Sequence, residues 1–475
     1  CGNNGEGTIE NCYNTGEVSG GNESSRIGGV CGYNKGTITN CYFLSGTDAN
    51  ATQATAKQFK SGEVAYRLGG AFYQKLDVDA SPVLDSTHGK VYLASPCIAY
   101  SNTENAVAEH KFGENGFCTV CGAYEPASED ENEVYQIANV GNLYWFMEYV
   151  NNNAVYNEDA DAYLAKANAV LVNDITVNKN LLDSLKFDEF GNVANGDDFK
   201  AWNPIGHFNG DYDAFVNYTG TFDGRGHTIS GLYLNNPSID CVSLFGEIKG
   251  ATIKNVGVTD SYFEGYYYVG GVCGNNHKGH IVNCYNTGVV SGSYDVGGVC
   301  GCNSGTIENC YNTGVVSVSA DFIGGVCGYN DEGGTITNCY FLSGTDANAT
   351  QKTAKQFANG EVAKLLFASD SIWGQNTSTD TIPNFSGKII FTVSVSASEN
   401  GIVSGENGEY EYNTKLAIEA IQNEGYHFVK WSNGSSEIKD TILVVSDTAL
   451  VATFEAHSFG NWDTTLVATC AVAGL

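Results

Sequence analysis

Three cysteines and one histidine lie close together in a short polar stretch of the chain, as Cys97, His110, Cys118 and Cys121. Thiolate sulfur and imidazole nitrogen are the usual ligands of structural zinc, and a Cys-x-x-Cys pair commonly supplies two of the four. The stretch has few aliphatic residues, so a bound ion would provide folding free energy that its small core cannot. We therefore predict a structural zinc site at these four residues. Two alternatives remain open, a disulfide between Cys118 and Cys121 or a linker that binds no metal.

A second set of residues could carry out acid–base chemistry around the sequence FDGRGH at residues 222–227. A polysaccharide-cleaving enzyme needs clustered carboxylates beside a basic side chain, and the candidates are Asp174, Asp223, Arg225, His227 and Asp260. The alternative, which we favour, is that the Asp and Gly residues of FDGRGH form a tight turn between strands. None of the eight histidines is followed by Glu, so the His-Glu-x-x-His motif of zinc peptidases is absent.

A repeated unit surrounds these residues and must position them. The sequence GGVCG recurs so that Cys273, Cys300 and Cys327 are spaced 27 residues apart, and each is followed by Asn-Cys-Tyr. A unit of this length, with three short β-prone pieces between Gly and Asn punctuation, is typical of one coil of a β-solenoid. Stacked coils lie about 4.8 Å apart, so equal positions form ladders. The predicted ladders are Cys273/Cys300/Cys327, Cys284/Cys310/Cys339, Tyr285/Tyr311/Tyr340, Asn276/Asn303/Asn330 and Asn283/Asn309/Asn338.

The cysteines of the repeats are predicted to be small, buried core residues with free thiols. A disulfide along a ladder would leave the third member unpaired, although a bridge across one coil, such as Cys300 to Cys310, remains an alternative. Cys241 and Cys302 fall outside the repeat pattern, and the sequence indicates no partner for either.

A longer duplication encloses the repeats. Residues 41–65 recur at 339–363 with 22 of 25 positions identical, directly after the last Cys-Tyr of each set. Helical spacing of apolar residues follows in both copies, at Phe59, Val64 and Leu68 and at Phe357, Val362, Leu365 and Leu366. We predict that this segment caps the open end of each solenoid, where unpaired strand edges would aggregate. A helix over residues 135–150, with Leu143, Phe146, Met147 and Val150 on one face, is predicted to cap the other end of the second copy.

At this point the chain resembles known families. GGVCGYNKGTITNCY resembles the GLUG repeat of bacterial surface proteins, including exported regions of IgA-specific metallopeptidases, although that family usually has an aliphatic residue in place of the GGVCG cysteine. FDGRGHTISGL resembles the early coils of right-handed β-helices in adhesins. NGIVSGENGEY, NEGYHFVKWSNG and LVATFEA resemble a divergent internalin-type B-repeat, which implies a small β-grasp-like domain used as a spacer in Gram-positive surface proteins.

The predicted fold class is mainly β, a right-handed parallel β-helix (β-solenoid) with helical caps and a small β-grasp-like repeat domain. The predicted domains are the C-terminal part and cap of a first β-solenoid (1–95), a Cys/His-containing linker module (96–128), a complete second β-solenoid with both caps (129–385), an internalin-type B-repeat-like β domain (386–455) and the truncated start of a further module (456–475). The chain begins at Cys1 without a leader, so we expect it to be a fragment of a longer protein.

Composition restricts the partners. The chain has 54 acidic and 23 basic residues, a formal charge of −31, which repels phosphate backbones and anionic lipid. No apolar run reaches the roughly 18–20 residues of a membrane helix. We therefore expect no nucleic acid and no membrane insertion. The resemblance implies a non-enzymatic extracellular, secreted or cell-surface repeat protein of a Gram-positive-like bacterium, with an adhesin, binding or display role toward a host or environmental glycan or protein. The alternative is a carbohydrate-active β-helix enzyme, a polysaccharide lyase or glycoside hydrolase.

Overall fold

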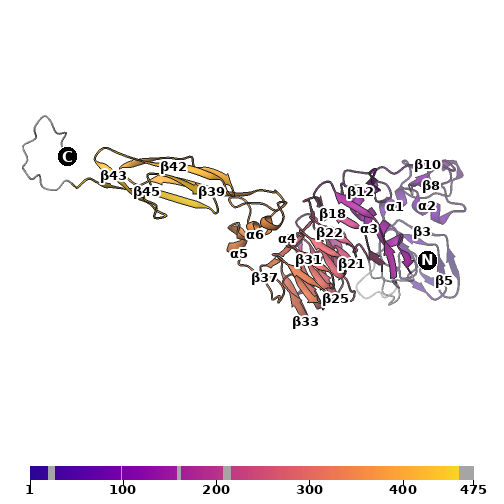
Figure 1. Cartoon of the computed structure of the whole chain (residues 1–475). Coiled ribbons are helices and arrows are strands. Elements are labelled where there is room, and N and C mark those ends of the chain that lie inside the picture. The colour runs from indigo at the N-terminus through magenta and orange to yellow at the C-terminus, as the bar shows by residue number, and fades with distance from the viewer. Residues whose placement is uncertain (20–26, 98, 158–161, 207–215, 459–475) are drawn as a thin grey trace, which may run out of the picture. The chain divides into compact units, whose positions relative to one another are not determined.

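The computed structural model describes residues 1–19, 27–97, 99–157, 162–206 and 216–458 (Figure 1). The chain divides into two compact units. The first comprises Cys1–Pro126 with Asn139–Trp145, and the second comprises Ala127–Ala138 with Phe146–Leu475. Among the described residues, no helix has both the length and the apolar character that crossing a membrane requires.

The second unit contains four stacked sheets whose strands pair in parallel from coil to coil, except for the antiparallel first pair of two sheets. One sheet comprises β11 (Ser128–Glu129), β12 (Val134–Ile137), β15 (Asn168–Leu171), β18 (Thr221–Asp223), β22 (Thr252–Lys254), β27 (His280–Val282), β31 (Thr306–Glu308) and β35 (Thr335–Thr337). The next comprises β13 (Val155–Asn157), β14 (Ala162–Ala165), β17 (Val216–Tyr218), β21 (Phe245–Lys249), β26 (Cys273–His277), β30 (Cys300–Asn303) and β34 (Cys327–Asn330).

Two further sheets complete each coil. The third comprises β16 (Ile175–Thr176), β19 (Thr228–Ser230), β23 (Gly257–Thr259), β28 (Tyr285–Asn286), β32 (Tyr311–Asn312), β36 (Tyr340–Phe341) and β37 (Thr350–Gln351). The fourth comprises β20 (Tyr233–Asn235), β24 (Tyr262–Glu264), β25 (Tyr267–Gly270), β29 (Val289–Gly297) and β33 (Val316–Gly324). The predicted β-solenoid is thus present as stacked parallel sheets, but the prediction of three strands per coil was wrong. A strand of two residues such as β28 is too short to show the alternation that predicts strands.

The predicted ladders are present in register. Cys300 pairs with Cys273 on one side and Cys327 on the other, and Tyr311 lies between Tyr285 and Tyr340 in the same way. The rings of Tyr285 and Tyr311 are stacked, with centroids 4.9 Å apart and planes 3° apart. Exact repetition of the unit places chemically identical side chains at the spacing of neighbouring strands.

The asparagine ladder at the turn after β30 satisfies its own amides. Asn276 Nδ2 donates to Asn303 Oδ1 at 2.7 Å, and Asn303 Nδ2 donates to Asn330 Oδ1 at 2.8 Å. Asn303 is fully buried and also bonds the backbone of Gly305. Buried amides that pair along the stack avoid the cost of unsatisfied polar groups.

Asn303→Ala is therefore expected to destabilise the second unit by about 2–4 kcal/mol, because it removes both ladder bonds and leaves amide groups of two neighbours unpaired. Urea unfolding followed by circular dichroism measures the loss. The control is Asn348→Ala, an exposed position whose change should stay within about 0.5 kcal/mol. Equal unfolding midpoints for the two variants would contradict the role of the ladder.

The duplicated segment caps the second stack in an unexpected place. β37 pairs with the last strand β36, as an end cap would. However, helices α5 (Ala354–Ala358) and α6 (Glu361–Ser369) pack against the tyrosine ladder along the side of the stack. Trp373 reaches Asn283, two coils from the end, with its indole N–H 3.2 Å from Asn283 Oδ1. The predicted capping segment thus adds β37 to the last strand, and its helices also cover the tyrosine ladder, because amphipathic spacing identifies a buried face but not what covers it.

The helix before the second stack begins later than predicted. Residues Val134–Ile137 form strand β12, and helix α3 covers Val140–Asn152. Phe146 packs against Tyr218 and Phe222, with ring centroids 6.3 and 6.2 Å away, as expected for a cap. Two short helices lie within the early coils, α4 (Leu181–Ser184) and the 3₁₀ helix η2 (Gly196–Asp198).

The first unit repeats the same design in shorter form. Its coils pair β1 (Asn3–Asn4) with β4 (Tyr33–Asn34), β2 (Thr8–Glu10) with β5 (Thr37–Thr39), and β3 (Tyr13–Asn14) with β6 (Tyr42–Phe43) and β7 (Thr52–Gln53). Helices α1 (Ala56–Lys60) and α2 (Glu63–Leu68) follow. Thr55 and Gln58 form a capping box, exactly matched by Thr353 and Gln356 in the second copy.

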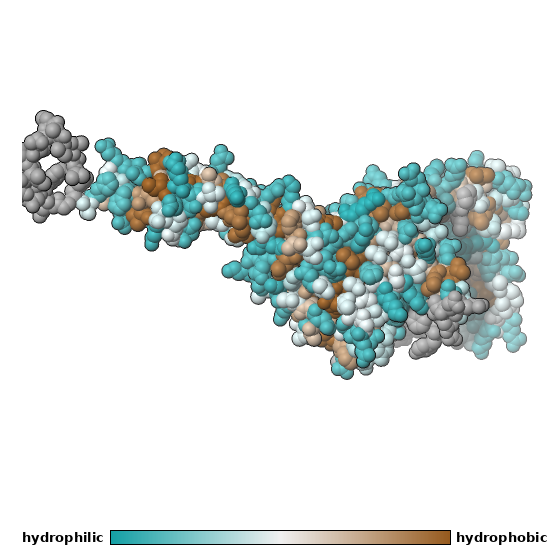
Figure 2. Space-filling view, in the orientation of Figure 1, coloured by the Kyte–Doolittle hydropathy of each residue, from teal (hydrophilic) through white to brown (hydrophobic). Residues whose placement is uncertain are grey.

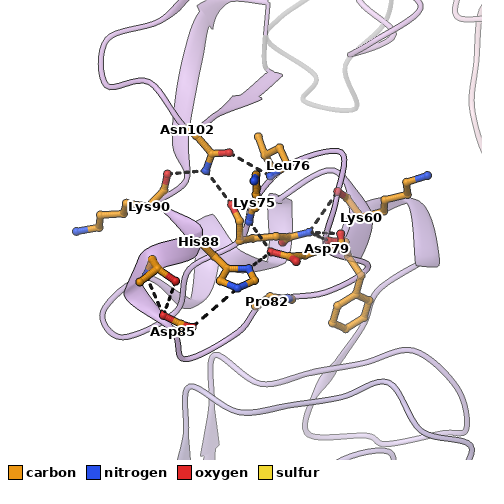
Figure 3. Close-up of polar contacts among 12 residues, drawn as sticks. Lys60, Lys75, Leu76, Asp79, Pro82, Asp85, His88, Lys90 and Asn102 are labelled. Carbon is orange, nitrogen blue, oxygen red and sulfur yellow. Dashed lines mark hydrogen bonds and ion pairs between the residues drawn. The ribbon is translucent and has the colours of Figure 1, made fainter.

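A polar cluster fixes the chain after α2 (Figure 3). His88, at the end of the 3₁₀ helix η1 (Ser86–His88), points toward Asp79, with Nδ1 and Oδ2 2.7 Å apart. The hydrogen bond from His88 holds the pKa of Asp79 below its usual range. Asn102 accepts from the Leu76 N–H and donates to the Lys90 carbonyl, which joins this cluster to the end of strand β9 (Ala99–Ser101).

The residues after the second cap form two β-sheets around a core that includes the fully buried Phe391 and Trp431. One sheet comprises β38 (Gln375–Asn376), β39 (Ile389–Ala397), β41 (Gly408–Glu411), β43 (Tyr426–Trp431) and β45 (Thr448–Ala456), and the other comprises β40 (Gly401–Ser404), β42 (Lys415–Gln422) and β44 (Lys439–Leu443). The truncated module predicted over residues 456–475 lies almost entirely outside the described residues.

Candidate metal centre

A small sheet in the first unit positions two of the four predicted zinc ligands. It comprises β8 (Tyr92–Pro96), the antiparallel β9 (Ala99–Ser101) and the parallel β10 (Val107–Ala108). Cys97 follows β8 directly, and its backbone N–H donates to the Ala108 carbonyl at 2.8 Å. Because His110 lies just after β10, the pairing of β8 with β10 brings Cys97 and His110 to the same end of the sheet.

A tight turn positions the other two ligands. The Cys118 N–H donates to the Ala123 carbonyl at 2.8 Å, and the Gly122 N–H donates back to the Cys118 carbonyl at 2.8 Å. Gly122 has a φ of +77°, a left-handed conformation that glycine adopts without steric cost. Gly122 was not predicted from the sequence. A Gly directly after the second Cys of Cys-x-x-Cys was the signal that could have indicated it.

The four side chains converge as a metal site requires. Their ligand atoms all lie within 4.8 Å of one another. Cys97 Sγ lies 3.6 Å from Cys118 Sγ, and Cys121 Sγ lies 3.4 Å from His110 Nδ1. Tetrahedral zinc with Zn–S bonds of about 2.3 Å places its sulfurs roughly 3.8 Å apart, close to the first of these distances. We call these four residues the Cys/His cluster.

The thiols of Cys97 and Cys118 in the Cys/His cluster have different pKa values. Burial, with the neighbouring thiols of Cys121 and Cys118, raises the pKa of Cys97 to about 12. Burial also acts to raise the pKa of Cys118, but the backbone N–H groups of Cys121 and Val120 and the His110 side chain outweigh it and lower that pKa to about 5. One thiolate is thus stable beside His110, while further thiolates need a cation to balance their charge.

The Cys/His cluster could therefore hold a metal ion. Cys97 and Cys118 are buried, whereas His110 and Cys121 are half-buried, so an ion would be shielded on one side and reachable from the other. No described cysteine forms a disulfide, so the structure does not contain the alternative Cys118–Cys121 bridge. Four protein ligands fill a tetrahedron, which suits a structural rather than a catalytic ion.

The candidate catalytic carboxylates near FDGRGH make hydrogen bonds and ion pairs that hold the turn. Asp223 Oδ1 accepts from the Arg225 N–H at 2.8 Å within the turn, and its Oδ2 lies 3.3 Å from Lys254 Nζ. Asp174 Oδ1 accepts from the Thr228 N–H and lies 3.3 Å from His227 Nδ1.

Asp260 stands apart from that turn. It accepts from the N–H groups of Leu181 and Leu182 and so fixes the start of α4. Each of the three carboxylates is thus engaged in local structure.

The structure also shows the surroundings of the cysteines that do not belong to the Cys/His cluster. The ladder cysteines of the second unit are buried, as predicted, whereas Cys1 and Cys12 in the first unit are exposed. Cys241 is buried and lies 3.0 Å from Glu247 Oε1, to which its thiol donates. Cys302 is half-buried and faces a groove described below. The sequence did not indicate either environment, because Cys241 lies outside the repeat pattern and the residues around Cys302 come from three coils.

Comparisons with known proteins identify two kinds of repeat in this chain. Residues 391–458 match the model of the divergent InlB B-repeat domain, and residues 265–291 and 292–319 each match the GLUG motif. Halomucin from Haloquadratum walsbyi is 37% identical over 97 residues, or 20% of this chain, and the chain spans only 1% of halomucin. This chain is also similar to the crystal structure of a Bacteroides ovatus protein that is provisionally described as an immunoglobulin A1 protease. The match covers 56% of this chain and 96% of that chain, with 18% identity and a TM-score of 0.36. This chain therefore contains GLUG motifs within its second β-stack and a divergent InlB B-repeat domain after it.

Proposed function

We propose that the chain is part of a non-enzymatic extracellular or cell-surface protein, in which the β-stacks present a binding face and the B-repeat domain acts as a spacer. The observation that carries the proposal is that Asp174, Asp223 and Asp260 accept backbone hydrogen bonds that hold turns and a helix start. The GLUG motifs, the B-repeat domain and the similarity to halomucin support a surface role.

The charge of the chain supports the expected class of partner. The net charge is −31, and the face shown in Figure 2 is mainly hydrophilic with scattered apolar side chains. Such a surface repels nucleic acid and anionic lipid and favours uncharged or basic ligands. We therefore infer a glycan or protein ligand outside the cell.

The test compares binding with turnover for the whole chain. Incubation with neutral and acidic polysaccharides should release neither reducing ends nor unsaturated sugars, while arrays of glycans and extracellular matrix proteins should show saturable binding. The alternative, a carbohydrate-active enzyme, would give a different result. Degradation by the wild-type chain that disappears in a folded Asp223→Asn variant would overturn the proposal, because that carboxylate should matter only for the local turn.

We propose that the Cys/His cluster holds zinc as a structural ion. Three thiolates and one imidazole are ligands that favour zinc, whereas calcium and magnesium take oxygen ligands. The ion would tie the end of β8 to the turn at Cys118 and Cys121 and so stabilise a segment with a small core. The corresponding test opens the Discussion.

Two finer features of the fold belong to the proposal as well. We infer that the β-stacks are right-handed, because crossovers between parallel strands of one sheet are right-handed in about 98% of cases. We also keep the prediction that residues 386–455 form a β-grasp-like domain. An experimental structure of the whole chain checks both.

A further inference from the structure

A groove of about 470 Å³ crosses three successive coils of the second unit. Its lining includes Tyr268, Asn275, Asp295, Phe322, Tyr329 and Asp331. This volume falls within the roughly 300–1,000 Å³ of small-molecule sites. The groove is distinct from the Cys/His cluster, which lies in the first unit.

One wall of the groove consists of side chains held at conformational cost. Tyr268, Asp295 and Phe322 occupy equivalent positions of consecutive coils, next to the paired residues Val269, Val296 and Ile323. All three have left-handed φ values, of +55°, +51° and +63°. Asp295 tolerates this conformation, but the bulky Tyr268 and Phe322 rarely adopt it, and such strain concentrates at ligand sites.

At another corner of the same coils, the residue with a left-handed φ is always asparagine. Asn283, Asn309 and Asn338 have φ values of +52°, +53° and +51°, and Asn tolerates the left-handed conformation well. The repeat thus uses Asn every time at that corner but Tyr, Asp and Phe at the groove. The groove residues therefore serve a purpose other than easing the turn.

The aromatic residues of the groove present ring surface to water. Phe322 is 56% exposed and Tyr329 is 40% exposed, although the two rings contact each other edge to face, with centroids 5.5 Å apart. The face of an aromatic ring carries partial negative charge and attracts the C–H hydrogens of a ligand packed on it. A ligand with flat C–H surfaces, such as a pyranose ring, would cover these rings.

The carboxylates of the groove require hydrogen-bond donors. Asp295 is half-buried, burial raises its pKa to about 6, and no described residue donates a hydrogen bond to its side chain. Asp331 is exposed and accepts only from the neighbouring Glu332 N–H. The groove lining contains no Lys or Arg, and its one histidine, His277, has Nε2 3.2 Å from Glu247 Oε2. An ionised carboxylate accepts hydrogen bonds but cannot donate them, so hydroxyl groups suit it and an anionic ligand is repelled.

We propose that this groove binds an uncharged oligosaccharide, whose hydroxyl groups donate to Asp295 and Asp331 and whose C–H faces pack on Phe322 and Tyr329. A sugar chain presents hydroxyl donors and C–H faces on every residue, whereas a peptide presents them only at isolated side chains. The inference rests on the proposed binding role of the chain and names its site and ligand class.

The experiment titrates the full chain with cello-, manno-, xylo- and galacto-oligosaccharides by calorimetry, beside oligogalacturonate and a lysine-rich peptide. At least one neutral oligosaccharide should bind saturably, and oligogalacturonate should not bind. Phe322→Ala, Tyr329→Ala and Asp295→Asn should each weaken binding at least about tenfold. Phe322→Leu should bind about as weakly as Phe322→Ala, because leucine has no ring face. The matched control is Phe190→Ala, at an 81% exposed aromatic residue outside the groove, which should bind as wild type does.

The outcomes separate this inference from the proposed function. Neutral oligosaccharide binding that the groove variants leave unchanged, with wild-type melting temperatures, would overturn the groove but leave the binding role intact. Binding of the lysine-rich peptide alone, or of a matrix protein alone, would also refute the oligosaccharide site. Absence of binding to every glycan and protein offered would contradict both proposals.

Discussion

Cys118→Ser is expected to abolish zinc binding at the Cys/His cluster. Its thiol has the lowered pKa of about 5 and lies 3.6 Å from Cys97 Sγ, so it is the ligand most ready to meet the ion as a thiolate. Serine places a hydroxyl where zinc requires a soft, ionised sulfur. Structural zinc in small domains contributes on the order of 10–16 kcal/mol of binding free energy, which is coupled to folding. Loss of the ion should therefore unfold the segment around residues 96–128.

The measurement is the zinc content of the reduced full chain by mass spectrometry, together with the rate of proteolysis within residues 96–128. The wild-type chain should carry about one equivalent and become sensitive to protease on chelation. Cys302→Ser is the matched control, since this half-buried thiol lies outside the cluster and should leave the zinc content unchanged. A reduced wild-type chain without zinc would end the proposal, and so would equal zinc content in the Cys118→Ser variant.

Gly298→Val is expected to destabilise the second unit by about 3 kcal/mol or more. A Cβ atom at Gly298 would come closer than 3.0 Å to Nδ2 of Asn312 and to the carbonyl oxygen of Gly325. Asn312 is fully buried and accepts the ladder bond from Asn286 at 2.9 Å, so it has no room to move aside. Overpacking a rigid core forces backbone shifts that repeat along the stack.

Thermal and urea unfolding of the second unit measure this effect. Lys278→Ala provides the comparison, because Lys278 is exposed on a turn and its side chain should contribute within about 0.5 kcal/mol. Were the two variants to unfold at the same temperature and urea concentration, the coil register around Gly298 would be incorrect.

The sequence predicted the repeating part of the fold in detail. The strict spacing of Cys273, Cys300 and Cys327 is enough to predict their register, because each coil must place equal residues over one another. The asparagine ladder at Asn303 followed from the same argument. A second such ladder, from Asn286 to Asn312, was not predicted, although it follows from the same repeat spacing.

The candidate sites were predictable to different degrees. The Cys/His cluster was predicted completely, since zinc ligands are recognised by residue type and all four lie within one short stretch. The groove at Asp295 and Phe322 was not predicted. Its members come from three coils, and nothing in their local sequence shows that Tyr268 and Tyr329 line the same space.

The sequence by itself thus determined the period of the coils, the ladders and the residues of the Cys/His cluster. Each of these depends on residue type and spacing within a few dozen residues. The tertiary structure alone decided that α5 and α6 lie along the tyrosine ladder, that Trp373 donates to Asn283, and that three coils enclose a groove. These arrangements are sums of many weak contacts between residues distant in sequence, and periodicity along the chain carries no record of which faces finally meet.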